Sequence, residues 1–303
     1  MSDVRTPDTH IDTDTDTGSA TPEVSGVPAP RRRRVRTATL VAAVPVLALV
    51  LLAVVGPWIT PHDPTRVVGT PSLPPGGEFL LGTDNAGLDV FSRTLAGARI
   101  DVVIATLATL LATVVGALVG LVVGMNEEHG GLRGAAARAA TRGMDLLEAV
   151  PTVIVALVVV SFFGTSTPTM VVTLSIILAP LQARLVRTEV LRVRHDAYLD
   201  AARQAGLSEV RLVLRHVLPN ATTPALQNAP VLFGVTIILT AALGFLGVGL
   251  PPPSPEWGAM ITRGAGDAAV GKFWAAGAPA AALCLAVASV AVFGRRLAAD
   301  LSR

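Results

Sequence analysis

Long uncharged stretches alternate with charged segments along the chain. The uncharged runs cover residues 37–59, 102–125, 149–183, 217–255 and 273–294. Because about 20 apolar residues cross the hydrocarbon core of a membrane, the first, second and last runs each predict one membrane-spanning helix. The run 149–183 is too long for one span, and Gly164-Thr165-Ser166-Thr167-Pro168 within it predicts a tight turn between two spans. Prolines near both ends of the run 217–255 restrict its helix to about residues 225–249.

These runs predict an all-α fold: a polytopic membrane protein with six transmembrane helices and both chain ends on one side. Nineteen of the 24 Lys and Arg residues lie on that side, and five lie on the other. Short cytoplasmic loops carry the excess of positive residues, so both termini are expected in the cytoplasm. Only 15% of the residues are charged, against about 25% in soluble domains, which agrees with a chain that lies mostly in lipid.

The polar segments divide the chain into regions. Residues 1–30 are rich in Thr, Asp, Pro and Ser without apolar periodicity, which predicts a disordered cytoplasmic tail. This long polar leader favours an uncleaved first span over a signal peptide. We expect three further regions: 31–100, the first transmembrane helix and an extracytoplasmic loop; 101–294, a core domain of five spans with a cytoplasmic loop at about 184–220; and 295–303, a short cytoplasmic end.

The extracytoplasmic loop contains apolar residues at near-helical spacing, namely Leu88, Phe91, Leu95 and Ala98. This pattern predicts an amphipathic helix along the outer membrane interface. Such a helix either braces the bundle or contacts another protein, and amphipathicity alone does not separate the two.

The residue types needed for common catalytic chemistry are absent from the sequence. The single cysteine, Cys284, and five scattered histidines give no disulfide framework and no zinc motif. The only lysine, Lys272, is followed by Phe273, so the chain has no Gly-x4-Gly-Lys-Ser/Thr loop with which to bind and hydrolyse ATP. We therefore expect no catalytic residue, metal site or cofactor in this chain.

The loop between the fourth and fifth spans predicts two helices joined at a sharp bend. The bend contains Asp200, Ala201, Ala202, Gly206, Leu207, Ser208 and Glu209. Gly206 suits the left-handed position that ends a helix, Ser208 can cap the next helix, and Glu209 complements its dipole. That helix is expected to place Val210, Val213, Leu214 and Val217 on one face and to stop at Pro219.

This loop has two other interpretations. It is either a well-capped connector whose arginines contact solvent or anionic lipid, or a DNA-binding helix-turn-helix. The second needs a third helix and a free domain, which about 37 residues between two spans do not provide. No nucleic-acid partner is expected.

Asp200-Ala201-Ala202-x3-Gly206, followed by Leu218-Pro219, resembles the Glu-Ala-Ala loop of ABC importer permeases. Two more segments resemble the second permease subunit of dipeptide, oligopeptide and nickel importers: Leu81–Arg93, with Gly82, Thr83, Asp84, Gly87, Asp89 and Arg93, and Leu243–Gly249 before Glu256-Trp257-Gly258. Asp200 stands where the family commonly has Glu, and Leu88 where it often has Arg. The resemblance covers about residues 31–294.

This resemblance implies a permease of the type I ABC importer fold in a prokaryotic cell membrane. The implied partners are a homologous second permease, two cytoplasmic ATPases that bind ATP and magnesium, an extracytoplasmic solute-binding protein and membrane lipid. The bend at Asp200–Gly206 would then couple the spans to the ATPases. Peptides are the expected solute, while nickel, metal chelates and opines are served by similar importers.

The second predicted span contains Gly116, Gly120 and Gly124, spaced by four. Such a ladder of small residues lets another helix approach closely, so we expect it to serve helix packing. An autonomous secondary transporter is the rival from a different class, and it would carry ionisable residues at mid-membrane. The middle of every predicted span lacks them, which favours a conduit driven by a partner's ATP cycle.

Overall fold

The computed structural model describes residues 37–196, 199, 202 and 204–301. The expected tail at 1–30, Asp200, Ala201 and residues 302–303 lie outside the described residues. Within the described ranges the regular secondary structure is helical, apart from two isolated bridges in the loop before residue 90. The all-α prediction is therefore confirmed.

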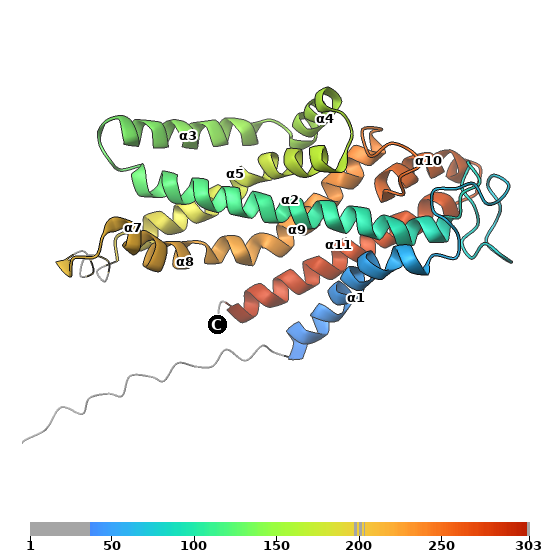
Figure 1. Cartoon of the computed structure of the whole chain (residues 1–303), viewed down its shortest axis with the longest axis horizontal. Coiled ribbons are helices and arrows are strands. Elements are labelled where there is room, and N and C mark those ends of the chain that lie inside the picture. Colours follow the sequence, from blue (N-terminus) through green and yellow to red (C-terminus); the bar gives the residue numbers. More distant parts are fainter. Residues whose placement is uncertain (1–36, 197–198, 200–201, 203, 302–303) are drawn as a thin grey trace, which may run out of the picture. The chain divides into compact units, whose positions relative to one another are not determined.

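Figure 1 shows how the helices follow one another along the chain. The elements are α1 (Thr37–Ile59), α2 (Val90–Asn126), α3 (Gly131–Ala149), α4 (Thr152–Phe163), α5 (Thr167–Val193), α7 (Glu209–Leu212), the π-helical turn η1 (Val213–Val217), α8 (Leu218–Ala221), α9 (Thr223–Phe245), α10 (Trp257–Ala269) and α11 (Trp274–Leu301).

Five helices in the described part of the chain are long and apolar enough to cross a membrane: α1, α2, α5, α9 and α11. A sixth crossing exists only if α3 and α4, which meet at 91°, together form one bent span. Of the two spans predicted in residues 149–183, α5 is thus long enough on its own, and α4 crosses only together with α3. The 12 residues of α4 rise about 18 Å, well short of the ~30 Å hydrocarbon core. Pro151, which stands between the two helices, accounts for the break.

The helix α2 is longer than the predicted second span. It begins at Val90 and continues unbroken to Asn126, so the prediction of a separate interfacial helix before residue 101 is wrong. The prediction ended the span at Asp101 because a charge usually marks the interface. Asp101 is instead buried, and its Oδ2 accepts a hydrogen bond from the Trp257 backbone N–H at 3.1 Å. A buried, partnered carboxyl group does not interrupt the helix.

The helix α11 also passes its predicted end at Gly294 and reaches Leu301. Residues 295–301 therefore belong to this helix and do not form a separate end. Near its last residues, Asp300 Oδ2 accepts a hydrogen bond from Thr39 Oγ1 near the start of α1 (2.6 Å). The start of the first span and the end of the last span therefore lie together.

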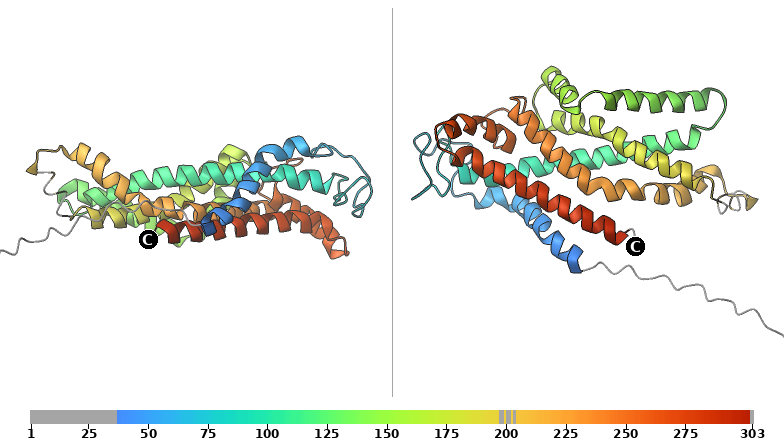
Figure 2. Two further views of the ribbon diagram at one scale, coloured as in Figure 1. Left: turned by 90° about the horizontal axis from the view of Figure 1, so that it is seen from below. Right: turned by 180° about the vertical axis from the view of Figure 1, so that it is seen from behind.

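The helices α2, α5 and α9 form the centre of the bundle. One apolar cluster joins them through Ile104 and Ala108 of α2, Met170 and Leu174 of α5, and Leu243 of α9. The helices α1 and α11 pack against each other beside this centre, as the two views of Figure 2 show. Their cluster includes Leu49 of α1 and Val290 of α11.

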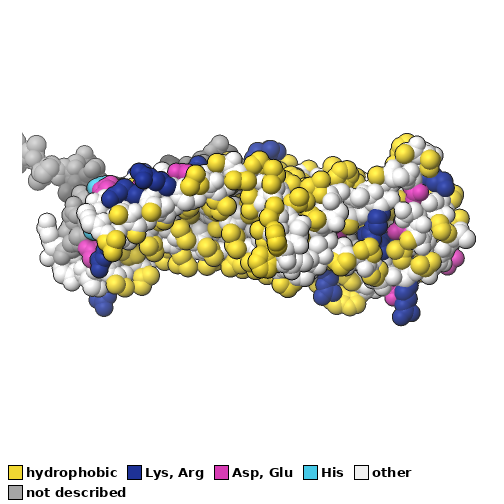
Figure 3. All heavy atoms as spheres, turned by 90° about the horizontal axis from the view of Figure 1, so that it is seen from above, with side chains coloured by type: hydrophobic (Ala, Val, Ile, Leu, Met, Phe, Trp, Pro, Cys, Tyr) yellow, Lys and Arg dark blue, Asp and Glu magenta, His cyan; other side chains and the backbone are white. Residues whose placement is uncertain are grey.

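Charged side chains gather toward the two ends of the bundle, and hydrophobic side chains cover the stretch between them (Figure 3). We call the end where α2 and α5 terminate the elbow end, because residues 199–217 bend there. The other end, with residues 60–89 and α10, is the loop end. A surface that is apolar between two charged ends is what a hydrocarbon core requires.

Candidate functional site

The bend at the elbow end is set by Gly206. Its φ is +84°, and a Cβ placed there would meet no atom within 4 Å. The Leu207 backbone N–H donates to the Ala202 carbonyl at 3.2 Å, which is the long hydrogen bond of a Schellman helix end. Glycine is thus required by the backbone conformation and not by lack of space.

The helix α7 begins directly after the bend. Ser208 stands at its N-cap position with an extended backbone, but its side chain makes no capping hydrogen bond. Glu209 is the first residue of α7, where its charge complements the helix dipole. Pro219 does not stop this segment as predicted, because η1 and α8 carry the chain on to α9.

The face of the elbow that packs on the bundle differs from the predicted one. Leu212 and Val217 are fully buried, whereas Val210 is 70% exposed and Leu214 is 59% exposed. The cause is η1, whose i→i+5 hydrogen bonds widen the turn and shift the buried face of the helix there. Together with Leu199 they contact Leu121 of α2 and the last turns of α5, at Val186, Val190 and Val193.

The helices α2 and α5 pack backbone to backbone along their length. Gly116, Gly120 and Gly124 all face α5: a Cβ on Gly120 would lie 2.4 Å from the Ala183 carbonyl oxygen, and one on Gly124 would lie 2.8 Å from Val190. At the elbow end Arg187 Nε and Nη2 donate to the Glu127 carboxylate at 2.7 and 2.8 Å, a bidentate pair. The hydrogen bond from Arg187 lowers the pKa of Glu127. The two helices therefore form one stiff unit.

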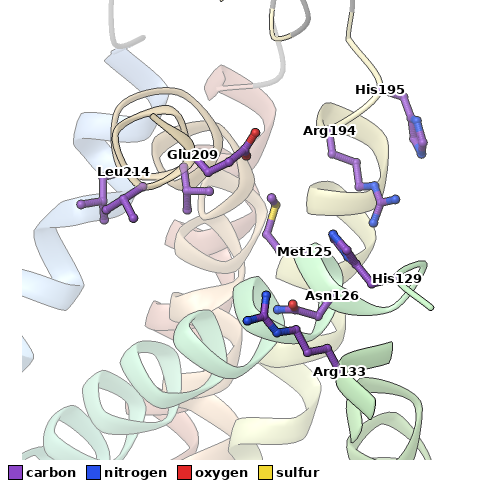
Figure 4. A pocket seen from close by; sticks show the side chains of 10 residues that line it. Met125, Asn126, His129, Arg133, Arg194, His195, Glu209 and Leu214 are labelled. Atoms are coloured by element: carbon purple, nitrogen blue, oxygen red, sulfur yellow. The ribbon is translucent and has the colours of Figure 1, made fainter. Parts of the chain in front are cut away.

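A cavity of about 790 Å³ lies beside the elbow. Figure 4 shows its walls: Met125 and Asn126 end α2, His129 and Arg133 lead into α3, and Arg194 follows α5. The exposed apolar side chains of α7 and η1 close the remaining side, with Glu209 at the rim. The hollow beside the elbow is thus lined by basic and apolar side chains.

At the loop end, Gly82, Thr83, Asp84 and Gly87 fold the segment before α2. Gly82 and Gly87 have φ of +71° and +77°, and a Cβ on either would lie 2.3 Å from a backbone carbonyl oxygen. Thr83 Oγ1 donates to the Thr70 carbonyl (2.7 Å), and Asp84 Oδ1 accepts from the N–H groups of residues 86 and 88.

Asp89 and Arg93 connect this folded loop to the bundle. Asp89 Oδ2 caps α2 by accepting from the Ser92 N–H at 3.0 Å. The fully buried Arg93 donates from Nη1 to the carbonyls of Pro64 (2.8 Å) and Pro253 (3.1 Å), and its Nε lies 3.7 Å from Asp84. The six loop-end residues thus form one hydrogen-bonded cluster that joins residues 60–89 to the loop before α10.

The model of the family described as "Binding-protein-dependent transport system inner membrane component" matches residues 116–299. The putative peptide transport system permease protein of Brucella suis biovar 1 (strain 1330) is 34% identical over 257 residues, which cover 82% of this chain and 81% of that protein. This chain belongs to that family. It is accordingly a multi-pass protein of the cell membrane.

Other permeases of this kind match over similar lengths. The di/tripeptide transport system permease protein DppC of Pseudomonas aeruginosa (strain UCBPP-PA14) is 33% identical over 255 residues, covering 82% of each chain. The glutathione transport system permease protein GsiD of Escherichia coli O1:K1 / APEC is 33% identical over 257 residues, covering 84% of this chain and 82% of that one. A chain of the MetNI methionine ABC transporter, solved in inward-facing conformations, shares the fold with a TM-score of 0.55 and 17% identity over 70% of this chain and 97% of that chain.

Some polar groups of this permease were missed by the sequence analysis. Glu256 is buried and caps α10, its two oxygens accepting from the N–H groups of Gly258 (2.6 Å) and Ala259 (2.9 Å). The buried Gln182 joins three helices by donating to Thr113 Oγ1 (2.8 Å) and the Ala225 carbonyl (3.1 Å). The Glu256-Trp257-Gly258 sequence stood out only through the family resemblance, and nothing in the sequence marked Gln182.

Proposed function

We propose that this chain is the non-catalytic, membrane-spanning permease subunit of an ATP-driven importer of peptides. Its partners are a homologous second permease, two cytoplasmic ABC ATPases that bind the ATP and magnesium, and an extracytoplasmic solute-binding protein. The observation that carries the proposal is the similarity to peptide permeases over 82% of the chain. The exposed elbow, continuous with the ends of α5 and α9, supports it.

The proposal places both termini and the elbow end in the cytoplasm. The six-span arrangement assigns 19 of the 24 Lys and Arg residues to that side, in agreement with the positive-inside rule. With Cys284 replaced by Ser, a cysteine at the exposed Glu78 should react with a membrane-impermeant reagent added to intact cells. A cysteine at Arg133 should react only after the cells are opened, and the reverse labelling would overturn this orientation.

The elbow would transmit force through its buried side. Closure of the ATPase pair would push on residues 200–206, and Leu199, Leu212 and Val217 would pass the displacement to α2 and α5. Because α2 and α5 are interlocked by the Gly ladder and by Arg187–Glu127, they would move as a unit. The 37 residues of α2 extend about 55 Å, so one helix reaches from the elbow to the Arg93 cluster at the outer end.

Peptide is the solute class that the named relatives suggest. Nickel, metal chelates and opines are the alternatives within the same architecture. An autonomous secondary transporter is the alternative from another class, and it would work without ATPase partners.

Proteoliposomes that contain the purified complex test the proposal. With binding protein outside and ATP inside, labelled dialanine should accumulate, and a non-hydrolysable ATP analogue should abolish the uptake. Uptake that follows an ion gradient and ignores ATP would refute the importer and support the secondary transporter. ATP-driven uptake of nickel or an opine in place of dialanine would refute only the peptide assignment.

A further inference from the structure

A small cavity opens at the loop end between the α4–α5 turn and α10. Its volume is about 290 Å³. Glycine, proline and small apolar residues of the loop after α9 form most of its wall. The polar side chains on the wall are Thr165 from the turn, and Thr262 and Arg263 from α10.

Arg263 is half-buried, yet within the described residues no carboxylate forms an ion pair with it. Its Nε donates to the Ala259 carbonyl at 3.1 Å and its Nη2 to the Ser254 carbonyl at 3.2 Å. No described residue accepts a hydrogen bond from Nη1. Burial lowers the pKa of Arg263, and the charges of Asp84 and Glu256 act in the opposite direction without outweighing it.

Two arginine and two acidic side chains lie around this cavity. Arg93 and Arg263 both donate to the Ser254 carbonyl, so two guanidinium groups meet at one loop. Asp84 faces both, but its Oδ1 is already held by two backbone N–H groups and its Oδ2 lies beside Arg93. Both oxygens of Glu256 cap α10, and burial raises its pKa to about 7.

We propose that this cavity binds the carboxylate of the solute in transit, with Arg263 as the ionic partner and Thr165 as an additional hydrogen-bond donor. Guanidinium and carboxylate form bidentate, charge-assisted hydrogen bonds. A cavity near 290 Å³ is at the small end of ligand pockets, so it suits one terminal residue and not a protein segment. The inference rests on the proposed function, since a peptide carries a carboxylate at its C-terminus.

Chemical protection of the wild-type protein tests this inference without turnover. The complex in lipid nanodiscs is treated with phenylglyoxal, which modifies accessible guanidinium groups, and modification is quantified by mass spectrometry of the peptide that contains Arg263. Dialanine should slow the modification of Arg263 severalfold, and dialanine amide should not. Arg66, whose side chain is 81% exposed, is the internal control. Its rate of modification should be the same with dialanine and with dialanine amide.

The inference would be overturned if dialanine and its amide protected Arg263 equally, or if neither protected it. Protection given by the solute-free binding protein alone would also overturn it, because the cavity would then receive an acidic group of that protein.

Uptake kinetics provide a second, independent readout. Arg263→Gln should raise KM for dialanine by roughly tenfold or more, the equivalent of losing one charged hydrogen-bonded pair, while leaving kcat nearly unchanged. Arg263→Lys should recover part of the loss, and Arg66→Gln should behave as wild type. If the wild-type complex imports dialanine and Arg263→Gln has the same KM, the carboxylate site is wrong although the importer stands.

Discussion

At the residue scale, backbone conformation and close approach decide what the functional positions tolerate. Gly206 has free space around it but a left-handed φ, whereas Gly120 has an ordinary helical φ and no space. The sequence analysis placed the two kinds of glycine correctly at a helix end and on a helix face. It gave no way to foresee that Leu212, and not Val210, is buried, because that depends on the π-helical turn.

Gly206→Val should uncouple the transporter and leave the subunit in the membrane. A β-branched residue at φ +84° is strained by about 1–3 kcal/mol, which distorts the bend but is small against the insertion of the apolar spans. The expected result is wild-type abundance with loss of ATP hydrolysis stimulated by binding protein and peptide. Gly206→Asn, which tolerates a left-handed backbone, should keep most activity. Gly143→Val, at an open helical position, is the matched control; full coupling in Gly206→Val would count against the role given to the bend.

Gly120→Ala should destabilise the subunit through the α2–α5 contact. The added methyl group would lie 2.4 Å from the Ala183 carbonyl oxygen, and overpacking of this kind costs about 1–3 kcal/mol. Thermal unfolding in detergent should shift to lower temperature. Gly234→Ala in α9, where a Cβ meets nothing within 4 Å, should leave the transition unchanged or raise it slightly. Equal unfolding temperatures for Gly120→Ala and Gly234→Ala would contradict a close contact between α2 and α5 at Gly120.

At the element scale, the sequence predicts the bounds of helices that face lipid. It does not predict the bounds of helices whose charged side chains are buried against other parts of the chain. The first span was predicted at residues 37–59, and α1 has those bounds. The start of α2 was predicted as a separate interfacial helix, and α10 was not predicted, because Asp101 and Glu256 look like surface charges in a sequence. Arg93 and Asp101 are hydrogen-bonded to Pro253 and Trp257, far along the chain, so their burial is a property of the assembled fold. The break between α3 and α4 at Pro151 was likewise hidden within an apolar run.

The docking of α10 should make stability depend on pH. Burial raises the pKa of Glu256 to about 7, whereas the pKa of a Glu side chain in an unfolded chain is about 4.3. Between these pH values the folded form binds more protons than the unfolded form. The free energy of unfolding therefore falls as pH rises from about 4.3 to about 7 and stays constant at higher pH. Unfolding temperatures of wild type and Glu256→Gln, measured across this range, should converge at low pH and diverge toward neutral pH, with the wild type lower. A constant difference would contradict a proton held by Glu256.

At the scale of the whole molecule, two differently built ends are joined by long helices. The elbow end presents an exposed bend and a basic cavity, while the loop end is a hydrogen-bonded cap around Arg93. The interlocked α2 and α5 connect them. This arrangement suits a subunit that receives mechanical work at one end and opens a path at the other.

The central claim is that the elbow docks on an ATPase, and site-specific photo-crosslinking in native membranes tests it most directly. A photoreactive amino acid is placed at Val210, which is 70% exposed beside the bend, or at Glu78 at the loop end, whose side chain is 76% exposed. We predict an adduct with an ABC ATPase subunit from position 210 and none from position 78. An adduct with the ATPase from position 78, or none from 210 in a complex that imports solute, would contradict the account.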